Sequence, residues 1–168
     1  MANTLRTGKL PRKCLMHFID ASFGGNSPSW YLLGKDIEDM SVEMNPDTEE
    51  TTNILDETTT TDNGYKPSIS ADSYMLNPSD SLYSTIKDIM MNRKSGGDCK
   101  TKILEVIVEN TDASDSQPGW TEDVIVKPAS YGGATGGISV PINISFDGGR
   151  KSGTVTFTNG VPTFTATT

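Results

Sequence analysis

The stretch KILEVIVEN, Lys102–Asn110, decides the fold class of this chain. Taken at the two-residue period of a β-strand, one face of this stretch is wholly apolar and the other mixes apolar and charged side chains. The two expected faces are Leu104, Val106 and Val108 on one side, and Ile103, Glu105, Ile107 and Glu109 on the other.

The residues that follow repeat this pattern. WTEDVIVKP (120–128), ISVPINISF (138–146), TVTFT (154–158) and a final VPTFT all suit strands, and the Asn159-Gly160 pair predicts a tight turn between the last two. The glycine-rich stretches SYGGATGG and KSGGDCK lack the GK[ST] ending of a phosphate-binding loop, so we interpret them as turns.

The residues before Lys102 predict one helix, over residues 78–94. Asn77 suits the N-cap, Pro78 suits the first helical position, and Gly96 and Gly97 would end the helix. An apolar stripe at helical spacing would pack on a sheet, and it consists of Leu82, Ile86, Ile89 and Met90.

The N-terminal half adds further extended segments. CLMHFID (14–20), WYLLG (30–34) and GYKPSISADSYM (64–75) suit strands, and IEDMSVEM (37–44) would place Met40, Val42 and Met44 on one face. We therefore expect one domain over residues 1–168 with seven to nine strands. Its predicted class is mainly β (α+β): an antiparallel β-sandwich or partly closed barrel with one docked amphipathic helix.

The segment NPDTEETTNILDETTTTDNG, residues 45–64, differs from the rest of the chain. It holds seven threonines and six acids, no Lys or Arg, and only Ile54 and Leu55 to bury. The alternatives are a disordered acidic linker, which composition alone favours, a metal site and an ordered arm. The acids do not have the spacing of an EF-hand loop, and threonine favours strands over disorder. With Ile54 and Leu55 midway along it, we expect an extended β-arm.

Charge is unevenly distributed. The formal net charge is −8 and the pI about 4.5, which argues against ordinary nucleic-acid binding and against docking on anionic membranes. Ten of the 22 acids lie between Asp36 and Asp62, whereas the N-terminal arm (1–13) has only basic charges, on Arg6, Lys9, Arg12 and Lys13. An acidic segment and a basic arm could attract each other between copies, but charge alone favours the simpler interpretation that both are solvated surface.

No catalytic or metal-binding pattern stands out. His17 is the only histidine, and Cys14 and Cys99 are far apart, so we expect buried or idle thiols, no cofactor, no metal and no enzyme. No apolar run approaches the length of a membrane span.

Taken together, these segments resemble the tail tube proteins (major tail proteins) of long-tailed bacteriophages. The resemblance covers nearly the whole chain and rests on order: WYLLG, then IEDMSVEMNP with the Thr/Glu-rich arm EETTNILDETT, then GYKPSISADSYM, the helix SLYSTIKDIMMNR, and a β-block ending GTVTFTNGVPTFT.

The resemblance implies a structural virion protein. Six copies would form a ring around a pore, the rings would stack into a tube, and DNA would pass through an acidic lumen without specific binding. Partners would be other copies and the tail terminator, tape-measure and baseplate or tail-tip proteins. The protein would lie in the virion tail after folding in the host cytoplasm.

In this family the long hairpin reaches the adjacent ring. It follows that the arm would order on a neighbour, with residues Glu49, Glu50, Thr51, Thr52, Ile54, Leu55, Asp56 and Glu57 making the contact. The alternatives are a tube subunit of a contractile tail, a phage-tail-like bacteriocin or a type VI secretion apparatus; more distant are a monomeric β-sandwich binding module and an acidic-site hydrolase.

Overall fold

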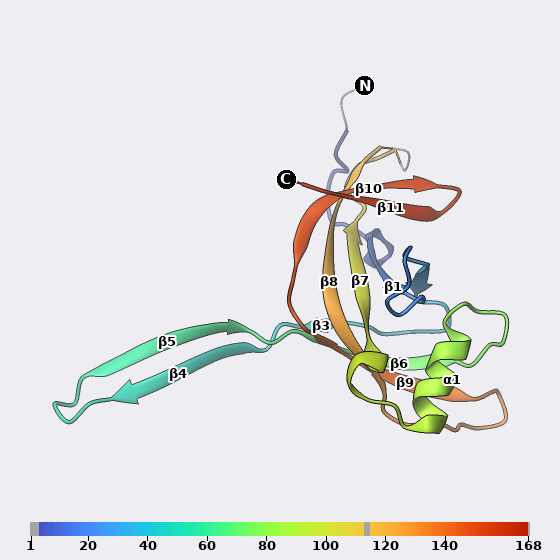
Figure 1. Ribbon diagram of the computed structural model, residues 1–168. Helices are drawn as coiled ribbons and strands as arrows, with labels where there is room; N and C mark the ends of the chain where they lie inside the picture. Colours follow the sequence, from blue (N-terminus) through green and yellow to red (C-terminus); the bar gives the residue numbers. More distant parts are fainter. Residues whose placement is uncertain (1–3, 113–114, 168) are drawn as a thin grey trace.

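The fold is known from a computed structural model, which describes residues 4–112 and 115–167 (Figure 1). In the described part the chain forms eleven strands and one α-helix. The elements are β1 Leu15–Asp20, β2 Trp30–Leu33, β3 Val42–Glu43, β4 Pro46–Thr52, β5 Thr58–Tyr65, β6 Ser68–Met75, α1 Tyr83–Asn92, β7 Lys100–Ile107, β8 Gln117–Pro128, β9 Ser139–Phe146, β10 Lys151–Thr158 and β11 Val161–Ala166, with short 3-10 turns at Arg12–Cys14 and Gly96–Cys99.

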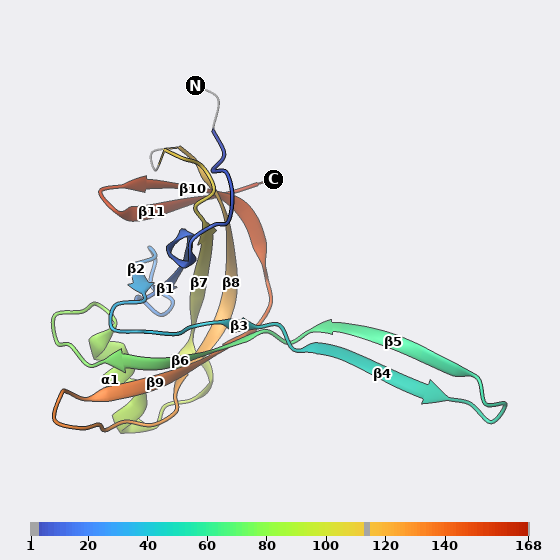
Figure 2. The same cartoon turned by 180° about the vertical axis from the view of Figure 1, so that it is seen from behind.

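Nine strands form one antiparallel sheet, in the order β2-β1-β7-β8-β9-β6-β3 with β10 and β11 attached to β8. The twelve-residue β8 lets the sheet branch, because its first half pairs with β10 and its second half with β9. The sheet curls into a half-barrel, with the β10–β11 hairpin at one end and α1 beside β6 and β9 at the other (Figures 1 and 2). This confirms the expected mainly-β class with a single docked helix.

The curled sheet buries apolar side chains on both faces. Successive residues of β7 face opposite sides, so Ile103 joins the cluster that packs on α1, whereas Leu104 and Val106 join a smaller cluster with Phe18 and Val155. The alternation expected for Lys102–Asn110 is therefore present, but it separates two cores and does not separate core from solvent.

Helix α1 is shorter than the expected span 78–94. Asn77 does not cap an α-helix: its side-chain oxygen accepts from the Ser79 N–H at 3.0 Å, and the chain turns until Leu82, the actual N-cap residue. At the other end Arg93 adopts a left-handed conformation (φ 50°), which ends the helix before the glycines. The expected apolar stripe of this helix, Leu82, Ile86, Ile89 and Met90, is buried.

The expected strand over 37–44 is wrong for most of its length. Only Val42 and Glu43 pair with β6, because the Met40 carbonyl accepts a hydrogen bond from the Arg12 guanidinium at 2.8 Å and not from a strand neighbour. Met40 is buried, whereas Met44 is half exposed.

The expected Asn159-Gly160 turn is confirmed: both residues have positive φ (52° and 81°), as a tight hairpin turn requires. On the same hairpin, Gly153 pairs with Gly119 of β8, and an added Cβ on Gly153 would collide with the Thr165 carbonyl. β10 and β11 can therefore lie this close only because residue 153 lacks a side chain.

Candidate assembly surfaces

The segment over residues 45–64 forms an arm, the β4–β5 hairpin, which makes a two-stranded sheet of its own. It projects away from the half-barrel in both views (Figures 1 and 2). Every residue from 48 to 63 is exposed, so the arm contributes nothing to either core. An isolated two-stranded hairpin in water is marginally stable.

A single asparagine organises the tip of the arm. The Asn53 side-chain oxygen accepts from the backbone N–H groups of Leu55 (2.9 Å) and Glu57 (3.1 Å), and its amide donates to the Glu57 carboxylate at 2.7 Å. Asp56 takes a left-handed φ of 60°, which closes the turn. This network leaves Ile54 fully exposed and Leu55 73% exposed, so the tip presents apolar surface to solvent.

The base of the arm is held by a second asparagine. Asn45 donates through its side-chain amide to the Lys66 carbonyl and the Ser68 hydroxyl, both at 3.1 Å, and Lys66 pairs with Asp47 at 2.7 Å. The arm therefore leaves the body from a braced position.

The sides of the arm carry threonine and glutamate. Glu49 lies opposite Thr61, and Glu50 opposite Thr60. Because neighbouring residues of a strand face opposite sides, each broad face of the hairpin has one of these carboxylates among threonines, including Thr51 on one face and Thr52 on the other.

The N-terminal segment runs along the end of the body away from the arm (Figure 1). Arg6 donates its backbone N–H to the Glu109 carbonyl at 2.8 Å, and Leu5 pairs with Asn110. The basic side chains expected here, Arg6, Lys9, Arg12 and Lys13, are all exposed.

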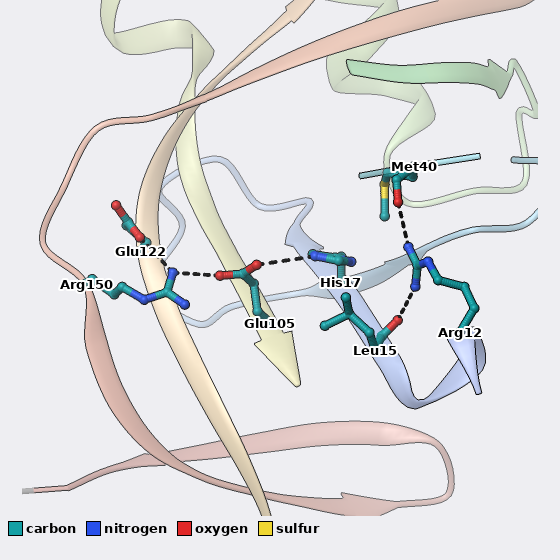
Figure 3. Close-up of polar contacts among 7 residues, drawn as sticks. All are labelled: Arg12, Leu15, His17, Met40, Glu105, Glu122 and Arg150. Carbon is teal, nitrogen blue, oxygen red and sulfur yellow. Dashed lines mark hydrogen bonds and ion pairs between the residues drawn. The ribbon is translucent and has the colours of Figure 1, made fainter. Parts of the chain in front are cut away.

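Arg12 differs from the other three because its guanidinium also donates to the carbonyls of Leu15 and Met40 (Figure 3). Within the described residues of one subunit, no ion pair joins this segment to the arm. The structure therefore does not bring the two expected partners together inside one copy.

A partly buried polar network connects β1, β7 and β8 with the loop before β10 (Figure 3). The sequence did not predict this network. Arg150 donates to the carboxylates of Glu105 at 2.6 Å and Glu122 at 2.9 Å, and it lies over the Trp120 ring. The buried His17 places Nε2 3.3 Å from Glu105, a close ion-pair distance without hydrogen-bond geometry.

These contacts shift the ionisation of the network. Burial alone would raise the pKa of Glu105, but His17 and Arg150 outweigh burial and hold that pKa below its ordinary value. Burial likewise opposes the charge of Arg150, yet its bonds to Glu122 and Glu105 raise the pKa of the guanidinium. These contacts thus link β1, β7 and β8 to the loop before β10. Sequence gives little signal for this network, because its members lie up to 133 residues apart.

The described residues contain no group of three or more His, Cys, Asp or Glu side chains placed to hold a metal. Cys14 and Cys99 are both buried and free. None of the described helices is long and apolar enough to cross a membrane.

Comparison with known proteins gives a fold likeness and no sequence match. No protein-family model and no curated protein matches the chain. Among solved structures, the tail of an empty GTA particle with C6 symmetry is similar over 94% of this chain and 100% of that one (TM-score 0.56, 13% identity). The SPP1 tail tube is similar over 86% and 78% (TM-score 0.57, 12% identity).

A third structure, the sheath/tube terminator of the PVC extracellular contractile injection system in its extended state, is similar over 87% of this chain and 97% of that one (TM-score 0.50, 14% identity). At such low identities the likeness concerns the fold, and on that basis the chain has the fold of the subunits found in phage-type tails and their tubes.

Proposed function

We propose that residues 1–168 form one tail-tube domain, a structural virion subunit that assembles with itself and catalyses no reaction. The arm is the observation that carries this proposal. A hairpin whose residues 48–63 are all exposed gains little from its own subunit, so a neighbouring copy is the natural source of its stabilisation.

We propose that six copies close into a ring and that rings stack into a tube. The C6 symmetry of the GTA tail supports this number, since that tail shares the fold. The main path of the sheet ends at β2 and at the two-residue β3, and β11, which pairs only with β10, ends the branch. Unpaired edges invite further strands, and a closed ring of head-to-tail contacts would cover them.

The second proposed contact joins oppositely charged segments of neighbouring copies. Glu49 and Glu50 on the strands of the arm would pair with Arg6, Lys9 and Lys13 of the basic N-terminal segment. Both partners are exposed, and they lie at different ends of one subunit (Figure 1), which suits a contact between stacked copies.

The proposed pore conducts DNA without binding it. Among the described side chains of β6 and β9 that face away from the core, Ser70, Asn143 and Ser145 are exposed, small and uncharged. A wall of hydroxyls and amides stays hydrated, while a chain of net charge −8 repels phosphate. Tail terminator, tape-measure and tail-tip proteins would be the other partners, in a virion tail assembled in the host cytoplasm.

The tube of a contractile tail or injection system remains the second candidate, because the PVC terminator also shares the fold.

Negative-stain electron microscopy and sedimentation of the purified protein over a range of concentrations test the proposal. We expect rings with a central pore, and tubes at high concentration. A roughly spherical monomer at every concentration would overturn it.

A deletion variant tests the arm. Removing residues 47–62 joins Pro46 to Asn63, two residues before Tyr65, with which Pro46 already pairs. We expect a folded monomer that does not polymerise, whereas loss of the fold or normal tubes would refute the role of the arm.

A further inference from the structure

The C-terminal end of α1 and the end of β8 enclose a groove of about 310 Å³, which we call the helix-end groove. Its apolar floor includes Ile89 and Met90, and its rim includes Arg93, Lys127 and the exposed Tyr131. Three basic residues and no acid line it, in a chain whose net charge is −8.

Two of the three basic side chains are available to a partner. Arg93 and Lys127 are exposed and make no ion pair within the described part of the chain. Lys94 is already bound to Asp88 at 2.6 Å, and this bond and the nearby Asp98 raise the pKa of Lys94. The groove therefore offers positive charge above an apolar floor.

The tip of the arm has the complementary chemistry. Ile54 and Leu55 are exposed apolar side chains, and the acids Asp56 and Glu57 follow them directly. A larger groove, of about 1060 Å³ beside β10 and β11, is lined by acids as well as by three lysines. It suits this tip less well, because two of its lysines, Lys100 and Lys102, already pair with Asp147 and Asp123. A third groove contains acids as well.

We propose that the helix-end groove of one subunit binds the arm tip of another copy, with Ile54 and Leu55 on the apolar floor and Asp56 facing Arg93 and Lys127. This inference rests on the proposed function and names the receptor of the arm. Both views show the arm pointing away from the body that carries α1 (Figures 1 and 2), so the tip that fills a groove comes from a different copy.

The contact is separate from the one proposed for the arm's strands. β4 has seven residues, which at about 3.3 Å each extend some 23 Å, so tip and strands touch different places on the neighbouring surface. The strand acids pair with the N-terminal segment, and the tip enters the groove.

Disulfide trapping tests the contact directly. In full-length protein carrying Leu55→Cys and Tyr131→Cys, mild oxidation at assembling concentrations should give a ladder of covalent multimers on a non-reducing gel. The matched control carries Leu55→Cys and Ile138→Cys, because Ile138 (54% exposed) lines a different groove and resembles Tyr131 (59%) in exposure. The native thiols are buried and should stay silent. A ladder that is absent, or equal in the control, would overturn the proposal.

Charge reversal gives a second measurement. Lys127→Glu should raise the concentration needed for half-maximal assembly at least tenfold, whereas Lys151→Glu, an exposed lysine beside the larger groove, should change it less than twofold. Equal effects of the two substitutions would exclude this groove as the receptor and leave the tube proposal standing. A wild-type protein that never forms rings or tubes would instead refute the proposed function itself.

Discussion

Removing the apolar tip of the arm should block assembly without weakening the fold. The variant is Ile54→Ser with Leu55→Ser. In the free subunit these side chains are 100% and 73% exposed, so their loss removes no packing. We expect the unfolding free energy to change by less than about 0.5 kcal/mol, as for other surface substitutions.

The effect on assembly follows from the surface that the tip would bury. Full burial of an aliphatic side chain is worth about 1.5–3 kcal/mol, and about 0.5–1 kcal/mol of this is lost to fixing its rotamer. Two such side chains contribute about 2–4 kcal/mol to each contact, which corresponds to roughly a 30- to 700-fold change in its association constant.

Sedimentation of assembled material against protein concentration measures this change, and the melting temperature of the monomer reports on the fold. The control is Met91→Gln, which removes a side chain of 57% exposure from the outer surface of α1 without lowering helix propensity. An unchanged assembly threshold in the double variant, or a large drop in its melting temperature, would refute the reasoning.

Three further predictions concern the body of the subunit. Arg150→Ala should lower the unfolding free energy by about 3 kcal/mol, the low end for a broken buried pair, because the Arg150 side chain is 45% exposed. Chemical denaturation would measure this, and an unchanged midpoint would show that the network does not brace the sheet. Because the folded-state pKa of Glu105 lies below its ordinary 4.5, its ionised form stabilises the fold above that pH and the contribution disappears as pH falls further. Melting temperatures between pH 6 and 3 should therefore fall more steeply for the wild type than for Glu105→Gln, and parallel curves would contradict the pKa shift. Gly153→Ala should lower the unfolding free energy by about 1–3 kcal/mol, because the added Cβ would collide with the Thr165 carbonyl and lie 2.7 Å from the Phe164 ring. An unchanged melting temperature would show that β11 moves freely.

Alternation with a two-residue period predicts strands correctly wherever a strand has a buried face, and Lys102–Asn110 is an example. The pattern could not show that both faces of β7 are buried, because the second cover is the β10–β11 hairpin, about 50 residues away in sequence. Long-range packing of this kind leaves no local signal.

The first and last residues of helices and strands were harder to predict than the presence of those elements, and side-chain hydrogen bonds explain why. Asn77 has the residue type of a helix N-cap, but it caps a turn, and the helix begins at Tyr83. Met40 fits a strand face, but Arg12 takes its carbonyl. Polar side chains compete with backbone partners for these bonds, and a sequence does not show which partner is in reach.

The two candidate assembly surfaces also differ in how far the sequence predicts them. The unusual composition of residues 45–64 shows that this segment does not belong to a core, because it has almost nothing to bury. Composition alone favours a disordered linker, and the hairpin was predicted only through the resemblance to tail tube proteins. The helix-end groove could not be found from sequence, since Arg93 and Lys127 lie on different elements and each alone looks like an ordinary surface base. Only the packing of α1 on β8 brings them together.

The arm illustrates how shape and stability can have different origins. Both faces of its strands are rich in threonine and neither is buried, so hydrophobic pattern does not fix the register of β4 against β5. Register is set at the two ends, by the Asn53 turn and by the Asn45 bonds to Lys66 and Ser68.

Such an arm has a defined form but little free energy of its own, and in the proposed tube the missing stabilisation would come from the surface it contacts. Ordering the arm therefore opposes the first contact between two copies. In a growing tube, the arms at the growing end would already be ordered by contact with the preceding ring. A newly added ring would therefore meet ordered arms without their entropy cost, so growth would be favoured over initiation.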